Sequence, residues 1–259
     1  MGTDRYAYQS RLRRVSPLPK LTLALTVLVL CLCCGSGSVG LATLAVMGIL
    51  ITCLGGLSPR VFLHFLKVPL AFLAVGCLTM LVRSYPVGTP VLLAVHVGGR
   101  LWGFDGAALA KAVQIFCTAL GCVGAMYFLA LNTPVTDLTM ALRRLHVPLL
   151  LVELMELTYR FIFVLAETAG RIRTAQESRL GYRGPGRSLS SLGTLCSMVF
   201  LRAWRKADRI YAALESRGYT GSLTTLAGDY RPGRRLYLVT LGVAAAQLAV
   251  WFGERRLLL

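Results

Sequence analysis

Long apolar runs constrain this chain more than any other feature of its sequence. Apolar residues make up 56% of its 259 residues and charged residues only 15%, and the mean hydropathy is +0.65. A typical soluble domain carries about 25% charged residues, whereas a bilayer-spanning helix needs about 20 mostly apolar residues, fewer where polar side chains reach the interface. The sequence therefore predicts membrane-spanning helices. The candidate runs are residues 18–34, 39–56, 68–82, 107–131 and 235–252.

The first run has a second interpretation. A basic N-terminus followed by a short apolar run is also typical of a cleaved signal peptide. No A-x-A cleavage site follows, and Gly35-Ser36-Gly37-Ser38 is typical of a tight turn. We therefore interpret the run as a membrane helix.

The positive charge is distributed unevenly and predicts the orientation. The net charge is +17; 16 of the 28 Lys and Arg residues lie between Asn132 and Arg235, and five more lie in residues 1–20. Positive charge is retained on the cytoplasmic side of membrane proteins, so both regions are expected there, separated by four spans. We expect an all-α polytopic protein of the cell membrane with about five spans. Its parts are an N-terminal membrane domain (1–131), a cytoplasmic helical region (132–234) and a C-terminal span with its tail (235–259).

The basic region is predicted to be helical rather than disordered. A short helix is expected from Pro134 to Leu145, then a long helix ending near Arg179, a linker at Gly184–Gly186, and a second long helix from about Leu189 to Arg217. The long helices are amphipathic, because basic residues lie off an apolar stripe with steps of three to four residues. The stripe consists of Cys196, Phe200, Trp204, Ala207, Tyr211 and Leu214. If the apolar stretch 148–166, which holds Glu153, Glu156 and Arg160, were embedded, it would add a sixth span.

Nearly the same sequence closes both long helices. Residues 175–182 read AQESRLGY and residues 213–219 read ALESRGY, so the copies share a pattern in which Leu180 is an insertion. An arginine in the last turn and a glycine just beyond it are also how helices ordinarily end. Two such copies favour a function: paired cationic helix ends whose planar guanidinium groups bind carboxylates of a partner.

These motifs resemble the transmembrane T component of energy-coupling factor (ECF) importers, whose paired cytoplasmic helices end in Ala-Arg-Gly-like motifs. Ser216-Arg217-Gly218 fits that pattern, and Ser178-Arg179-Leu180 departs from it because Gly181 comes one residue late. The opening residues 4–20 and Thr158-Tyr159-Arg160-Phe161-Ile162 are similar to the cobalt-importer branch, the CbiQ type. The resemblance covers nearly the whole chain.

The resemblance implies a coupling subunit with no catalytic residues. Two ATPase subunits would hydrolyse ATP, and this chain would transmit their closure to a substrate-binding S component, for cobalt or alternatively another metal or a vitamin. Membrane lipid is an expected partner and nucleic acid is not. The implied ATPase-coupling residues are Ser178, Arg179, Gly181, Ser216, Arg217 and Gly218, and the stripe residues Phe200, Trp204, Tyr211 and Leu214 would pack on the other coupling helix and the S component.

Other sites are poorly supported by the sequence. Residues 181–188 nearly match a P-loop, but Arg187 replaces its lysine and no α/β pattern surrounds it. Three scattered histidines and eight cysteines, seven of them in apolar runs, predict neither a metal site nor disulfides, so we expect no cofactor. A lipid-modifying membrane enzyme using Glu153, Glu156 and Glu167, and a binder of anionic lipid or nucleic acid, are the alternatives.

Overall fold

The structure is a computed structural model that describes residues 2–81, 83–85, 93–97, 100–104, 106–219 and 230–257. The chain divides into two compact units. Unit 1 comprises residues 1–138 together with 228–259, and unit 2 comprises residues 139–227.

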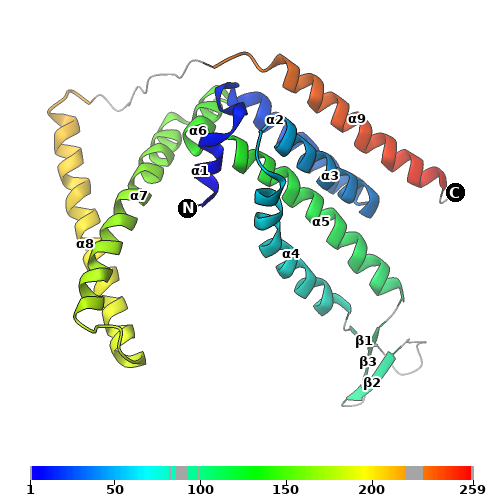
Figure 1. Ribbon diagram of the computed structural model, residues 1–259, viewed down its shortest axis with the longest axis horizontal. Coiled ribbons are helices and arrows are strands. Elements are labelled where there is room, and N and C mark those ends of the chain that lie inside the picture. Colours follow the sequence, from blue (N-terminus) through cyan, green and yellow to red (C-terminus); the bar gives the residue numbers. More distant parts are fainter. Residues whose placement is uncertain are drawn as a thin grey trace. The chain divides into compact units, whose positions relative to one another are not determined.

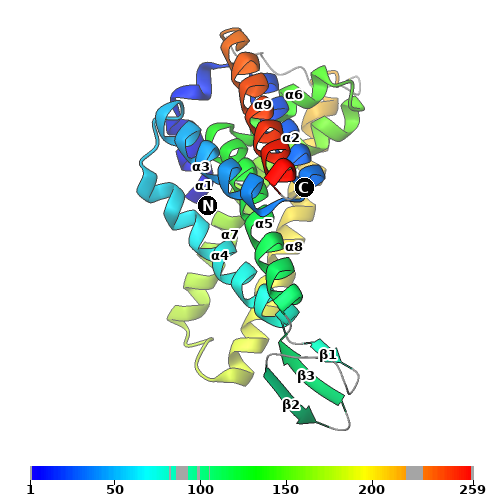
Figure 2. The same ribbon diagram turned by 90° about the vertical axis from the view of Figure 1, so that its right-hand side faces the viewer.

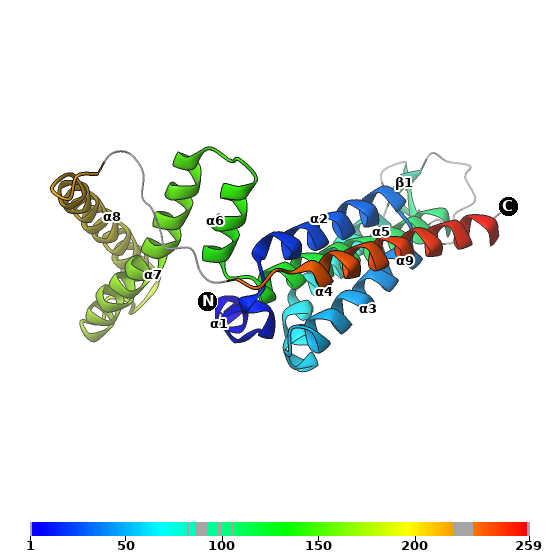
Figure 3. The ribbon, with the colours of Figure 1, turned by 90° about the horizontal axis from the view of Figure 1, so that it is seen from above.

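Unit 1 is a bundle of apolar helices that lie side by side (Figure 3). Four of them are long and apolar enough to cross a membrane, and a fifth, α3, is apolar but only 17 residues long. The prediction of about five spans in an all-α polytopic membrane protein is thereby confirmed. The helical elements are α1 (Gly2–Gln9), the 3₁₀ turn η1 (Arg11–Arg14), α2 (Pro17–Cys34), α3 (Gly37–Cys53), α4 (Pro59–Leu81), α5 (Gly106–Asn132) and α9 (Arg234–Leu257).

Close backbone packing of α3 on α5 organises this bundle. A Cβ at Gly40 would collide with the backbone of Cys117, and one at Gly121 would lie 2.6 Å from the carbonyl oxygen of Gly40. Small residues that let helices approach closely are typical of membrane interfaces. Around this contact Met47 and Phe128 are buried with other apolar side chains of the bundle.

A small antiparallel sheet connects α4 to α5 (Figure 2). Its strands are β1 (Arg83–Tyr85), β2 (Leu93–Val97) and β3 (Arg100–Phe104), in the order β1-β3-β2. The sequence of residues 83–100, with Pro86, Gly88 and Pro90, predicts a loop with one short apolar piece at residues 91–97. That prediction is wrong for the described part, because β3 pairs with β1 on one side and with β2 on the other, which pairs backbone groups on both edges of β3.

Unit 2 consists mainly of two long helices, which cross in Figure 1. They are α7 (Leu149–Ser178) and α8 (Pro185–Glu215), and α6 (Val135–Arg144), whose first residues belong to unit 1, precedes them. The predicted linker at Gly184–Gly186 is wrong. Gly184 precedes the helix with φ 93°, and Pro185 opens it, as proline does at a first helical position. α7 is not among the helices apolar enough to cross a membrane, so a sixth span finds no support there.

Candidate partner-docking site

The two copies of the motif lie at opposite ends of an antiparallel pair of helices. Near the turn between them, the Gln176 amide of α7 donates to the Ser191 carbonyl of α8 at 3.0 Å. At the far end, the Tyr219 hydroxyl, just beyond α8, lies 3.5 Å from a Glu153 carboxylate oxygen of α7. Because α8 returns along α7, Arg179 and Arg217 close opposite ends of unit 2.

Both helix ends form the same hydrogen-bonded cap. At the first end the amides of Leu180 and Gly181 donate to the carbonyls of Glu177 and Gln176, at 3.0 and 2.9 Å. At the second end the corresponding distances are both 3.0 Å. The pairs there run from Gly218 to Glu215 and from Tyr219 to Leu214. This 5→2 and 6→1 pattern is a Schellman motif.

The caps establish which residues of the two copies are equivalent. Leu180 has φ 55° and Gly218 has φ 74°, and both occupy the left-handed position just after the capping arginine. The interpretation of Leu180 as an insertion is therefore wrong: Leu180 is the counterpart of Gly218, and Gly181 is the counterpart of Tyr219. A left-handed residue with a Cβ costs roughly 1–2 kcal/mol.

Gly181 has a different role from Gly218. Gly181 does not need a positive φ, but a Cβ there would lie 2.8 Å from the Ser191 hydroxyl and 2.9 Å from the Gln176 carbonyl oxygen. The Ser191 hydroxyl donates to the Gly181 carbonyl at 2.8 Å, which draws the two helices together at the turn. The first end thus uses glycine for close packing, and the second uses it for backbone conformation.

Both arginines are exposed, whereas the serines beside them bond to their own helices. The Ser178 hydroxyl donates to the Thr174 carbonyl and the Ser216 hydroxyl to the Ala213 carbonyl, each at 3.0 Å. No ion pair in the described part of the chain involves Arg179 or Arg217. Both guanidinium groups are therefore exposed and have no ion pair in the part of the chain that the structure describes.

Arg179 lines a hollow of about 330 Å³ between α7 and α8. Arg171 and Arg202 line the same hollow, and no carboxylate does. Arg171 is paired with Glu167 at 2.6 Å, while Arg202 has no ion pair among the described residues. The hollow therefore offers an acidic side chain the guanidinium groups of Arg179 and Arg202, neither of which has an ion pair among the described residues. Only Arg179 belongs to the repeated motif.

The Arg217 end is anchored to α7 through Tyr219. Burial and then the neighbouring Glu153 carboxylate raise the pKa of Tyr219. Glu153 is buried, and the tyrosine hydroxyl faces it. Tyr219 therefore turns back toward α7, whereas Arg217 stays exposed.

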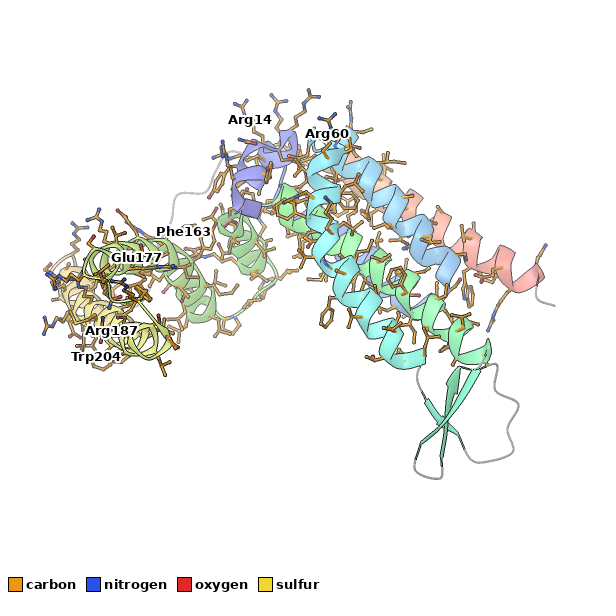
Figure 4. The ribbon with its side chains drawn as sticks, turned by 60° about the horizontal axis from the view of Figure 1, so that its bottom comes forward. Arg14, Arg60, Phe163, Glu177, Arg187 and Trp204 are labelled. Carbon is orange, nitrogen blue, oxygen red and sulfur yellow. The ribbon has the colours of Figure 1, made fainter. Side chains whose placement is uncertain are left out.

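An apolar cleft of about 630 Å³ separates α7 from the last turns of α8. Tyr211 and Leu214 line this cleft, whereas Phe200 and Trp204 do not. The rings of Phe200 and Trp204 lie next to each other, with centroids 6.3 Å apart and planes tilted by 43°, and each side chain is 63% exposed. The predicted stripe thus divides into two parts: Phe200 and Trp204 face outward, and Tyr211 and Leu214 face α7. Figure 4 labels Trp204 on α8 and Phe163 on α7.

Sequence reasoning missed a buried polar cluster in unit 1. The Lys20 ammonium is fully buried and donates to the carbonyls of Leu12 and Asn132 at 3.1 and 3.2 Å. The Ser10 hydroxyl donates to the Asn132 side-chain oxygen at 2.7 Å. Polar residues within membrane helices are rare and pair with one another or with backbone carbonyls. The sequence feature that could have indicated this cluster is the presence of Lys20 and Asn132 at the ends of apolar runs.

The cluster lies where the chain leaves unit 1 and returns to it. Asn132 ends α5, and Asp137, a few residues later, accepts a bond of 2.9 Å from the Tyr230 hydroxyl. Tyr230 directly precedes Arg231, whose amide donates to the Arg14 carbonyl at 2.8 Å and whose carbonyl accepts from the Ser16 amide at 3.2 Å. Asp137 and Tyr230, on either side of the chain segment that forms unit 2, therefore lie together at one end of the bundle.

The same end of unit 1 is strongly basic. Arg14 and Arg60 both lie there, away from the sheet (Figure 4). The exposed arginines on the elements that begin or end at this side are Arg5, Arg11, Arg13, Arg14, Arg60, Arg231, Arg234 and Arg235. Among the described residues, no three His, Cys, Asp or Glu side chains gather in a way that could hold a metal ion.

The geometry defines a multi-pass membrane protein that carries an exposed basic helical hairpin with two equivalent arginine-capped ends. The chain belongs to the CbiQ family of cobalt transport proteins, whose family pattern matches residues 9–226. It is therefore a membrane component of cobalt transport.

Relatives match along most of the chain. The cobalt transport protein CbiQ of Salmonella typhimurium is 30% identical over 220 residues, which cover 85% of this chain and 97% of that protein. The Rhodobacter capsulatus CbiQ is 33% identical over 233 residues, 86% of each chain. An uncharacterized Methanocaldococcus jannaschii protein, MJ1089, is 32% identical over 235 residues, 91% of this chain and 87% of the relative.

Proposed function

We propose that this chain is the transmembrane coupling component of an ATP-driven cobalt importer of the ECF type and has no catalytic role itself. Its two arginine-capped helix ends, at Arg179 and Arg217, would bind two cytoplasmic ATPase subunits. The observation that carries the proposal is the pair of identical caps, each presenting an exposed arginine with no ion pair among the described residues. Arginine binds carboxylates through two parallel hydrogen bonds, which makes such a docking contact both strong and geometrically specific.

The basic end of unit 1 supports a cytoplasmic location for the N-terminus and for unit 2. Eight exposed arginines lie at the end through which the chain enters and leaves residues 139–227, and positive charge is retained on the cytoplasmic side. The outward-facing Phe200 and Trp204 offer an apolar surface for a substrate-binding S component. ATPase closure would then reach that component through α7 and α8.

Co-purification from detergent with the host's candidate ATPases tests the proposal. The wild-type chain is expected to retain an ATPase, and the double variant Arg179→Glu/Arg217→Glu is expected to lose it. The double variant Arg205→Glu/Arg209→Glu has the same charge change on the same hairpin and should retain the ATPase. Equal retention by all three proteins would refute the docking role of the two ends.

A further inference from the structure

Leu180 is the residue at which the two helix ends differ most. In the equivalent position the second end has Gly218, for which a positive φ carries no steric cost. Leu180 adopts the same left-handed conformation with φ 55° although it has a Cβ. Among the other described residues, His146 is the one non-glycine residue that shares a positive φ.

Nothing in the described part of unit 2, residues 139–219, requires a leucine there. The Leu180 amide donates to the Glu177 carbonyl, and a glycine would make the same bond without strain. The side chain is 58% exposed, so core packing does not hold it in place. Strained backbone that local packing does not explain is typical of functional sites.

We propose that Leu180 is a specificity residue of the first helix end, where its side chain enters an apolar recess of the ATPase beside the carboxylate that binds Arg179. This inference rests on the proposed function. Arg179 and Leu180 are consecutive and both exposed, so a protein surface that binds the arginine also meets the leucine. An apolar side chain that excludes water from a charged contact strengthens that contact.

The two ends are then not interchangeable. Beyond Arg217, Gly218 has no side chain, and Tyr219 turns back toward Glu153 of α7. Among the residues that the structure describes up to Tyr219, the second end therefore presents an arginine with no apolar side chain directly after it. The partner surface that receives the first end must combine a carboxylate with an apolar recess, and the surface that receives the second needs only the carboxylate.

The Leu180→Gly variant tests the inference, because a structural role and a recognition role of Leu180 predict different effects on ATPase binding. Removing the side chain relieves strain in the free and the bound protein alike, so a merely structural leucine predicts unchanged binding. We expect the detergent-purified full-length chain to bind the co-expressed ATPase about tenfold more weakly, the effect of losing one buried apolar side chain. Leu180→Met, which keeps the apolar reach, should bind within about twofold of wild type.

The controls separate this inference from the function on which it rests. Leu192→Ala, at another exposed leucine of the hairpin, should leave binding unchanged. If Leu180→Gly binds as tightly as wild type while Arg179→Glu/Arg217→Glu does not bind, the role of Leu180 is wrong and the docking proposal stands. Equal weakening of ATPase binding by Leu192→Ala would indicate a general apolar contact and would also contradict the specific role of Leu180. If the double arginine variant binds like wild type, the docking proposal itself is wrong.

Discussion

The two units of this protein differ in how much of their apolar surface they bury themselves. In unit 1, helices α2, α3 and α5 contribute a continuous core that includes Val27, Met47 and Phe128. In unit 2, α8 has no buried residue along its 31 residues, and α7 buries only Val152 and Glu153. A soluble hairpin with this little core would be only marginally stable.

The contrast indicates two kinds of design. Unit 1 is held by its own packing and by a buried polar cluster, as expected for a scaffold that keeps its shape in lipid. Unit 2 is held together by contacts near the two ends of the α7–α8 pair, and an open cleft lies between the two helices. Its arginines and several of its aromatic side chains are exposed. Regions that move or bind partners are drawn from such sparsely packed parts of proteins. Each of the following experiments tests one side of this contrast.

The largest effect is expected at the contact between α3 and α5. Gly40→Leu would drive a side chain into the backbone of Cys117, and overpacking of this kind costs about 3 kcal/mol or more. The variant should lose its monodisperse peak in detergent. Gly170→Leu on α7 is the matched control, because no atom lies within 4 Å of a Cβ built there. Equal damage from both changes would mean that unit 2 is as tightly packed as unit 1.

A smaller but clear loss is expected when the buried cluster is broken. Lys20→Met leaves the carbonyls of Leu12 and Asn132 without their donor, at a cost of about 3 kcal/mol. Thermal unfolding in detergent should shift downward by several degrees. The exposed Lys67→Met should change the unfolding temperature very little. A normal unfolding temperature for Lys20→Met would show that the cluster does not stabilise the bundle.

The spans and long helices could be predicted from the sequence because apolar runs and helical periodicity are local signals. The approach of Gly40 to Gly121 and the contact of Lys20 with Asn132 could not, since each joins residues that are distant in the chain. The sheet around β3 was missed because its strands are short and depend on pairing with one another.

The two arginine ends of the candidate site could be predicted from a repeated motif, but their cap geometry could not. The motif favoured pairing the two glycines, whereas the hydrogen bonds pair Leu180 with Gly218. Arg202 was seen only as one of several basic residues on α8. Its place beside Arg179 depends on how α7 crosses α8, which no local pattern encodes.

An intermediate effect on binding is expected at the hollow beside Arg179. Arg202→Glu would place a carboxylate there that competes with the partner's for the Arg179 guanidinium. ATPase binding should weaken about tenfold, equivalent to about 1.4 kcal/mol. Arg209→Glu makes the same charge change on α8 outside this hollow and should have little effect. Equal weakening by both would indicate that net charge, not this hollow, governs binding.

The smallest effect is expected from exchanging the residues that follow the two capping arginines. Leu180→Gly should stabilise the end of α7 and Gly218→Leu should destabilise the end of α8, each by about 1 kcal/mol, because only glycine adopts the left-handed conformation without strain. Amide hydrogen exchange measures both, since the Gly181 and Tyr219 amides close the caps. Slower exchange at Gly181 and faster exchange at Tyr219 are expected, with unit 1 unchanged. If Gly181 exchanged faster in Leu180→Gly, the leucine side chain would be holding the cap together, and the reason to assign Leu180 to a partner would disappear.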